Sequence, residues 1–365
     1  MTAVGWIEVI VGIVIVGATF YDLFHSVVLP RPSVNRFIFI RAFFGMVWKT
    51  WRWIGKGIRM PARRETWLAT FGPLMVIVIF VLWALAFMVG YALILDGLRS
   101  QIHPLLDGFG ESLYFSATTI VPLSYGDFVP TGFGARVAII FESATGVGIA
   151  ALVITLLFSL YGAFQEREEL VVQLDAIAGA PPSGVQLLET VFERGLRNEL
   201  IKTFDEWRHW SAAVLESHLA YPILLYFRSS HDNEAWLNSF GAVMDAAALV
   251  LTAVDEDEQG PARLMFTVGN HLVEDLAWYF RYTTTKEPLV ERDEFDEAVA
   301  RLKKAGYRTK AGEEAWISFT HHRGKYASPL IWMADRLAIV PAEWIGDRTY
   351  APHVDGRGRT RRRLP

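Results

Sequence analysis

The sequence has no cysteine among its 365 residues, which excludes disulfide bridges, thiolate zinc sites and a cysteine nucleophile. It also lacks an HExxH motif and an EF-hand loop, the patterns that most often reveal a catalytic zinc or a calcium site. The formal net charge is only -4, which gives no indication of a nucleic-acid partner. We therefore expect no enzyme, no resident cofactor and no metal site.

Apolar sequence, by contrast, is abundant, at 52% hydrophobic and 13% aromatic residues. Three stretches, at about residues 4–29, 68–95 and 135–164, are long enough to cross a hydrocarbon core, which needs about 20 apolar residues. The first lacks the basic start and small-residue cleavage site of a signal peptide, and it carries Glu8 and Asp22. We expect three retained transmembrane helices in an integral protein of the plasma membrane.

The segment between the first two apolar stretches is strongly basic, with Glu65 as its one acidic residue. Its cations are Arg31, Arg36, Arg41, Lys49, Arg52, Lys56, Arg59, Arg63 and Arg64. Because short loops rich in Lys and Arg remain on the cytoplasmic side, this pattern predicts an outside N-terminus and a cytoplasmic C-terminal region. Aromatic residues alternate with the cations, which predicts either a helix in the lipid headgroup region or a helix packed on the protein.

The chain changes character after the third apolar stretch, where charges become frequent and Pro181-Pro182 interrupts a helical pattern. Apolar residues then recur at three- and four-residue intervals, which predicts an all-helical soluble bundle. We expect an all-α membrane protein with these parts: first transmembrane helix 1–30, basic interfacial segment 31–66, pore domain 67–165, linker 166–183, helical cytoplasmic domain 184–340 and disordered basic tail 341–365.

The polar stretch "SATTIVPLSYGDFVP", residues 116–130, lies between the second and third apolar stretches. Residues 110–121 can form a short helix, which is too short to cross a bilayer. A backbone that re-enters the membrane must be buried in protein or line a water-filled cavity. The simplest structure with that property is a pore loop.

The same stretch resembles the pore domain of the potassium channel family, whose pattern is a short helix, Thr-x-x-Thr-x-Gly-Tyr-Gly-Asp and a glycine-hinged inner helix. Aligned without gaps, residues 125–127 match Tyr-Gly-Asp, residues 114–116 match the start of the pore helix, and Gly146 falls at the hinge. Pro130 and Arg136 also occupy common positions. The resemblance implies a homotetramer whose four loops form rings of carbonyl oxygens around K+ or another monovalent cation.

The sequence departs from the family inside the filter, where Pro122-Leu123-Ser124 replaces Thr-Val-Gly. Pro122 offers no hydroxyl for the innermost ion ring, and Ser124 replaces a glycine whose backbone freedom a side chain restricts. Either the filter conducts cations with relaxed selectivity, or it is pinched. The alternative function is a non-conducting membrane sensor or scaffold in which the soluble domain carries the activity.

The resemblance also implies roles for individual residues. The predicted site is the filter Pro122, Leu123, Ser124, Tyr125, Gly126 and Asp127; the pore helix Ser116, Thr118 and Thr119; the gating hinge Gly146 and Gly148; and the cavity lining Val147, Ala150, Ile154 and Phe158. The two glycines serve either as a hinge or for close helix packing. Glu142, an acid inside a membrane helix, either braces the pore helix through Thr118, Thr119 or Ser124 or is protonated and silent.

Two further sets of ionisable residues each have a functional and an ordinary interpretation. Asp96, Asp107, Glu111 and Asp127 form either an acidic vestibule that concentrates cations at the mouth or an ordinary solvated loop. Asp22 and His25 are either a proton-sensitive pair or a surface pair at the membrane boundary. The expected partners are other copies of the chain, membrane lipids and permeant cations, with no nucleic acid.

Overall fold

The computed structural model of the chain describes residues 2–28, 38–123, 125–229, 235–255, 259–282, 287–310, 312–342 and 344. These residues are mostly helical, and the two named strands among them are two residues each. The predicted all-α fold is therefore confirmed. The chain forms two compact units. One, Met1–Ser33 with Thr70–Gly162, contains the predicted pore domain and is called the pore unit for that prediction; the other, Val34–Ala69 with Ala163–Pro365, is called the C-terminal unit.

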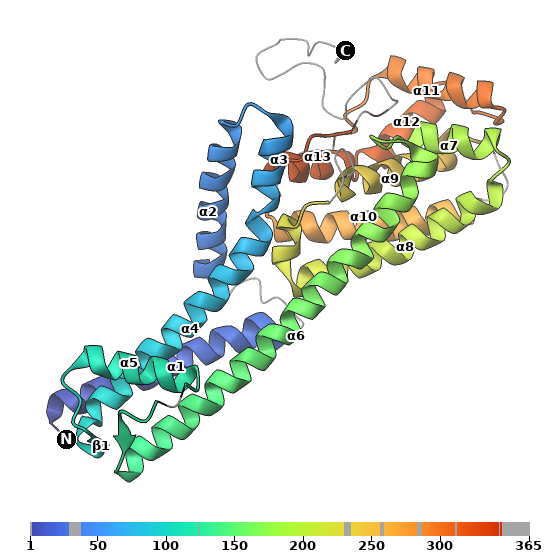
Figure 1. Ribbon diagram of the computed structural model, residues 1–365. Coiled ribbons are helices and arrows are strands. Elements are labelled where there is room, and N and C mark those ends of the chain that lie inside the picture. The colour runs from blue at the N-terminus through green and yellow to red at the C-terminus, as the bar shows by residue number, and fades with distance from the viewer. Residues whose placement is uncertain are drawn as a thin grey trace. The chain divides into compact units, whose positions relative to one another are not determined.

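The pore unit contains the helices that could span a membrane. They are α1 (Ala3–Leu23) with its π-helical extension η1 (Phe24–Val28), α4 (Phe71–Gly97) and the first part of α6 (Phe133–Ala178). Among the described residues, three helical stretches are long and apolar enough to cross: Ala3–Val27, Ala62–Gly97 and Phe133–Ala178. These stretches confirm the three predicted spans. The short helix α5 (Phe109–Ile120) packs against α4 (Figure 1).

Helices α1 and α4 run antiparallel and touch through paired glycines. A Cβ atom added to Gly12 would lie 2.4 Å from the carbonyl oxygen of Gly90, and one added to Gly97 would lie 2.4 Å from that of Gly5. Small residues let membrane helices approach at backbone distance, where van der Waals contacts stabilise the pair without a hydrophobic driving force. The first span is thus closely packed on the outer helix of the pore domain.

A short β-ladder and its flanking residues hold the C-terminal end of α4 and the N-terminal end of α6 together. Strand β1 (Ile102–His103) pairs antiparallel with β2 (Val129–Pro130), with Ile102 opposite Pro130. The preceding 3-10 helix η2 is Arg99–Gln101, and the Gln101 side-chain oxygen accepts a bond of 3.1 Å from the Ala135 N–H at the start of α6. This acceptor satisfies one of the backbone donors that every helix N-terminus leaves without an intrahelical partner.

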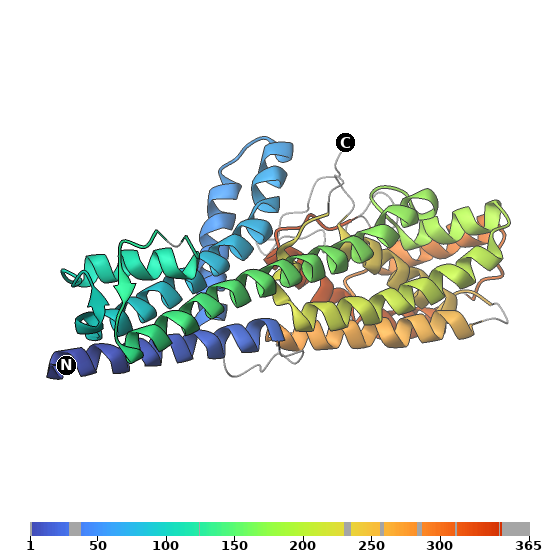
Figure 2. The same ribbon diagram turned by 60° about the horizontal axis from the view of Figure 1, so that its bottom comes forward.

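The C-terminal unit is a bundle that also includes helices from the N-terminal half of the chain. Its elements are α2 (Ile38–Lys56), α3 (Pro61–Ala69), α7 (Gly184–Glu193), α8 (Arg197–Ala220), the 3-10 helix η3 (Pro222–Tyr226), α9 (Trp236–Thr252), α10 (Gly260–Tyr279), α11 (Arg292–Ala305), α12 (Glu313–Arg323) and α13 (Ala327–Arg336). Helices α8 and α10 lie side by side in both views (Figures 1 and 2). The apolar α9 is buried along nearly its whole length.

The last turns of α6 belong to this bundle. Residues 166–178, which the sequence predicted as part of a linker, continue α6 without a break, and Val171, Leu174 and Ala178 join the buried core. Gly179, with a φ of +80°, follows the helix directly, because glycine reaches this left-handed conformation without a Cβ clash. The pore domain and the bundle are therefore joined by one continuous helix.

The basic segment 31–66, predicted to be interfacial or packed on the protein, folds as α2 and α3 within its described part. The Trp48 indole N–H donates to the Arg336 carbonyl oxygen at 2.8 Å, so one face of α2 contacts α13. Met46 and Trp53 are 67% and 74% exposed, so another face is free of the described chain. Residues 345–365, the greater part of the predicted disordered tail, lie outside the described residues.

Candidate functional site

The pore helix α5 is held by two buried serine–carboxyl contacts. Ser112 and Ser116 are one helical turn apart and fully buried. The Ser112 hydroxyl donates to the Asp96 carboxylate of α4 at 2.9 Å. The Ser116 hydroxyl contacts the Glu142 carboxyl of α6 and lies 2.9 Å from the Met88 carbonyl oxygen of α4. The pore helix is therefore braced on both sides, by the outer and by the inner helix.

Glu142 braces the pore helix, but not through the residues that the sequence suggested. Its side chain is fully buried and its contact is with Ser116. The hydroxyls of Thr118 and Thr119 instead donate to the Phe115 carbonyl oxygen within α5, at 3.0 and 2.8 Å. Threonine in a helix commonly bonds the carbonyl of the preceding turn in this way. The third suggested partner, Ser124, lies outside the described residues.

Gly146 lies where α6 crosses the C-terminal end of the pore helix. A Cβ atom at this position would be 1.9 Å from the Ile120 carbonyl oxygen, a distance that no side chain can occupy. A Cβ atom at Gly148 would meet nothing within 4 Å. Close packing is thus a sufficient reason for glycine at 146, whereas the hinge role proposed for both positions remains a prediction.

The filter segment begins with a backbone bond from the Leu123 N–H to the Thr118 carbonyl oxygen, at 2.9 Å. From that point it is exposed in the single chain, and Leu123 and Tyr125 are 49% and 66% accessible. Gly126 has a φ of +79°, in the region that glycine adopts readily and a side chain resists. Pro122 and Asp127 are also exposed.

Asp127 interacts with the pore helix that precedes it. Its carboxylate hydrogen-bonds the Tyr114 hydroxyl, which raises the pKa of Tyr114 because the bond favours the protonated phenol. The aromatic rings of Tyr114 and Phe128 lie edge to face, with centroids 6.3 Å apart. The Tyr-Gly-Asp end of the filter is thereby connected to the start of the pore helix.

The predicted cavity residues share one face of α6. Val147, Ile154 and Phe158 are 61%, 55% and 77% exposed, and Ala150 is also exposed. Their spacing of three and four residues places them along one side of the helix. In a single chain this apolar face is uncovered, as expected for a surface that meets other subunits or lipid.

The acidic residues near the outer loop do not form one group. Asp96 is only 7% exposed and accepts from Ser112, so it braces α5 and does not line a vestibule. Glu111 accepts a bond of 2.6 Å from the Asp107 N–H at the start of α5. Sequence reasoning missed the Asp96–Ser112 contact, although the four-residue spacing of Ser112 and Ser116 places both hydroxyls on one face of the helix.

The Asp22 and His25 side chains make separate contacts. The Trp83 indole N–H of α4 donates to the Asp22 carboxylate at 2.8 Å, and Nδ1 of His25 lies 2.8 Å from the Tyr21 carbonyl oxygen. The Asp22 contact adds a polar tie between α1 and α4. Among the described residues there is no group of three or more His, Cys, Asp or Glu side chains placed to hold a metal.

Comparison with known proteins points to the same segment. Residues 75–162 match the model of a family described as ion channel. The chain is also 20% identical over 215 residues to the uncharacterized membrane protein YdjJ of Bacillus subtilis (strain 168), a match that covers 57% of this chain and 61% of that protein. No solved structure matches. Residues 75–162, which contain most of α4, all of α5 and the membrane part of α6, are therefore an ion-channel domain of the two-helix potassium channel type.

Proposed function

We propose that the chain is one subunit of a homotetrameric cation channel. The observation that carries this proposal is the exposed filter segment, in which Tyr125 is 66% accessible and Gly126 has a φ of +79°. A filter of the potassium channel type works only when its carbonyl oxygens replace the water around the ion from several sides. One chain supplies one loop, so four chains around a fourfold axis complete the ring.

Permeation is proposed for K+ or for monovalent cations with relaxed selectivity. Pro122 stands where the family has the threonine whose hydroxyl forms the innermost ion ring, and proline has no backbone N–H to fix the strand. The carbonyls of the Tyr-Gly end remain available as ligands. Loss of the innermost hydroxyl ring leaves one site fewer that distinguishes K+ from Na+.

The proposed subunit sits in the plasma membrane with its N-terminus outside and its helical C-terminal unit in the cytoplasm. The basic residues between the first two spans support this orientation through the positive-inside rule. The exposed Met46 and Trp53 of α2, beside Lys49 and Lys56, suit contact with the headgroups of the inner leaflet. Accessibility of single introduced cysteines on the two sides of sealed vesicles tests the orientation directly.

The function is tested by ion flux through purified protein in liposomes loaded first with potassium and then with sodium. Gly126→Asp provides the control, because a side chain at a φ of +79° distorts the filter while leaving the buried braces in place. Flux that this substitution abolishes supports the channel, and the ratio of the two ions measures selectivity. Native mass spectrometry of the detergent-solubilised protein tests the tetramer.

A non-conducting sensor or scaffold is the second candidate, and the specific feature that favours it is the pair of filter replacements Pro122 and Ser124. Absence of flux from a tetrameric, folded protein at every voltage and pH applied would favour this candidate. The triple variant Pro122→Thr, Leu123→Val and Ser124→Gly rebuilds the family filter. If this variant conducts, the altered filter is the reason why the wild-type protein gives no flux.

A further inference from the structure

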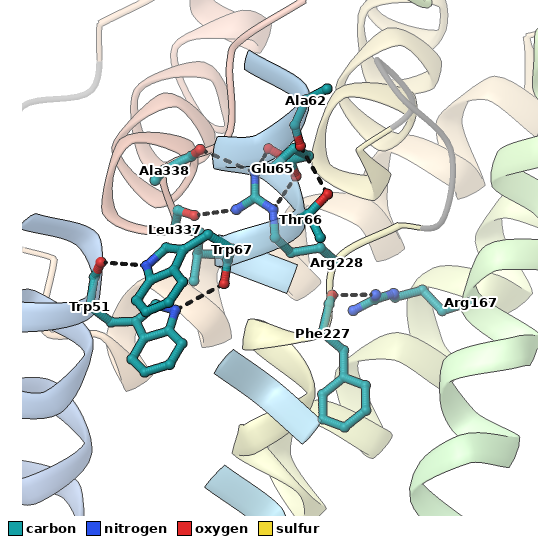
Figure 3. Close-up of polar contacts among 10 residues, drawn as sticks. All are labelled: Trp51, Ala62, Glu65, Thr66, Trp67, Arg167, Phe227, Arg228, Leu337 and Ala338. Atoms are coloured by element: carbon teal, nitrogen blue, oxygen red, sulfur yellow. Dashed lines mark hydrogen bonds and ion pairs between the residues drawn. The ribbon is translucent and has the colours of Figure 1, made fainter. Parts of the chain in front are cut away.

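The segment 222–228, made of η3 followed by Phe227 and Arg228, contacts the helices that lead into both sides of the pore domain. Phe227 and Arg228 are neighbours in the chain, yet one accepts from α6 and the other binds α3 (Figure 3). We call residues 222–228 the coupling segment.

Arg228 forms the contact with α3. Its guanidinium forms two hydrogen bonds with the Glu65 carboxylate: Nη2 donates to Oε2 at 2.9 Å, and Nε donates to Oε1. The same guanidinium donates to the carbonyl oxygens of Leu337 and Ala338, at 2.7 and 3.2 Å. The Arg228 side chain is only 10% exposed, whereas that of Glu65 is 40% exposed. A two-pronged arginine–carboxylate pair fixes orientation as well as distance.

Helix α3 connects the Glu65 contact to the outer helix α4, because α3 is packed firmly against α2 and leads directly into α4. The indole of Trp51 stacks on that of Trp67 with centroids 4.1 Å apart, and each indole N–H donates to the other residue's carbonyl oxygen, at 3.0 and 3.1 Å. These contacts lock α2 to α3. The stretch Ala62–Gly97, which contains Glu65 and α4, forms one continuous candidate span.

Arg167 forms the contact with α6, the inner helix. Its side chain is 1% exposed, and it donates to the carbonyl oxygens of Phe227 and Leu224 at 2.7 and 3.0 Å. Its guanidinium also lies over the rings of Phe164 and Trp236, at 5.3 and 5.4 Å. A buried arginine with these partners cannot shift without moving the segment it binds, because each lost bond would leave a buried charge less well satisfied.

We propose that the coupling segment is the point at which the C-terminal unit controls the pore. The segment ties the extension of the outer helix, through Glu65, and the extension of the inner helix, through Arg167, to one short stretch of chain. A rearrangement of the bundle that displaces this stretch moves both extensions together. The Glu65–Arg228 pair belongs to the state described here and is broken in the alternative state of the pore. The inference rests on the proposed channel function.

The test is a double-mutant cycle on flux with Glu65→Ala, Arg228→Ala and the double variant. Each single variant removes the Glu65–Arg228 ion pair, so each should shift the flux rate in the same direction, by roughly threefold or more. The double variant should shift the rate little further, because the pair is already lost in each single variant. Asp335→Ala is the matched control, because Asp335 pairs with Arg52 at 2.8 Å between α2 and α13 but is 77% exposed and does not touch the coupling segment. Its flux stays at the wild-type rate.

A second readout does not depend on conduction. The chain has no cysteine, so spin labels placed at Thr66 and Glu169, both exposed, report the separation of α3 and α6 without further changes. Glu65→Ala broadens or shifts this distance distribution, and Asp335→Ala leaves it unchanged. Diluting labelled chains with unlabelled ones confines the signal to one chain.

The outcomes separate the two proposals. If the wild-type protein gives no flux but the label distance changes with Glu65→Ala, the channel function fails while the tie between the two extensions stands. If the wild-type protein conducts and Glu65→Ala behaves like Asp335→Ala in both readouts, the coupling proposal is overturned. Independent, additive shifts from the two single variants also overturn it.

Discussion

Helices α6 and α9 are both strongly apolar, but their surroundings differ. Only 11% of the apolar window of α6 is buried, whereas nearly every residue of α9, from Trp236 to Val250, is buried among its neighbours. Length separates the two cases: α6 has 46 residues and α9 has 17, so only α6 can cross a bilayer and continue. The comparison extends to their units, because the C-terminal unit buries its own core while the pore unit leaves long apolar faces uncovered in the single chain.

The largest expected effect concerns backbone packing in the pore unit. Gly146→Val places a Cβ atom 1.9 Å from the Ile120 carbonyl oxygen, so α6 cannot keep its contact with the pore helix. We expect no folded oligomer on size-exclusion chromatography. Gly148→Val is the matched control, because nothing lies within 4 Å of its Cβ position, and it retains the wild-type elution. Normal assembly of Gly146→Val would contradict the packing described here.

The next effect concerns the core of the C-terminal unit. Arg323 donates to Asp245 at 2.9 Å, with the two side chains 0% and 1% exposed, and Tyr326 donates to the same oxygen at 2.6 Å. Asp245→Ala leaves a buried guanidinium without its counter-charge and should cost about 3–5 kcal/mol in the free energy of unfolding. Denaturant unfolding of the full chain measures this cost.

The control for that measurement is an exposed ion pair of similar geometry. Asp296 pairs with Arg292 at 3.0 Å, and its side chain is 54% exposed. Asp296→Ala should therefore change the free energy of unfolding by less than about 1 kcal/mol. Equal costs for the two substitutions would show that burial of the Asp245 pair does not matter.

The third effect is a pH dependence in the C-terminal unit. Burial, aided by the charge of Arg167, lowers the pKa of His218 from 6.5 to about 3, and its neutral ring lies 2.8 Å from the Val214 carbonyl oxygen through Nδ1 and 3.3 Å from Arg167 through Nε2. Between pH 6.5 and pH 3 the unfolded chain binds the extra proton, so stability falls as the pH falls. The loss from this group is about 2 kcal/mol between pH 7 and pH 5.

His218→Gln keeps a donor and an acceptor without titrating, so it should flatten that part of the pH profile. The measurement is the free energy of unfolding of both proteins at several pH values. An unchanged slope in the variant would assign the pH dependence to other groups.

The smallest expected effect lies at the pore helix. Ser112→Ala leaves the buried Asp96 carboxylate without its donor and should cost about 1–2 kcal/mol in stability. Ser143→Ala, a half-buried position on α6, should cost less. Thermal unfolding of the oligomer in detergent compares the two, and equal shifts would argue against a brace between Asp96 and Ser112.

Much of the fold followed from patterns that are local in the chain. The three spans were predicted from length and apolar content, and the ion-channel domain from the register of Tyr125-Gly126-Asp127 with the flanking helices. A brace to the pore helix was one of two interpretations of the acid at 142, and its partner Ser116 was not identified. Several residues of α5 carry hydroxyl groups that could contact Glu142. Which of them does so depends on the rotation of α5 about its own axis.

The fate of residues 31–66 and 166–178 was harder to predict. An amphipathic basic helix suits a membrane surface and a protein surface equally well, and the contacts of Trp48 and Glu65 involve residues 336 and 228, far along the chain. The charged run after residue 164 suggested a linker. Its apolar positions, Val171 and Leu174, instead reach the core of the bundle.

The sequence by itself determined the membrane spans, the helical character of both units and the position of the ion-channel domain, because these depend on hydropathy, periodicity and motif spacing within short windows. The tertiary structure alone decided which distant polar groups meet. Ser112 with Asp96, Ser116 with Glu142 and Arg228 with Glu65 are long-range pairs. A buried charge or hydroxyl must find a partner, but its identity depends on how helices distant in sequence are brought together.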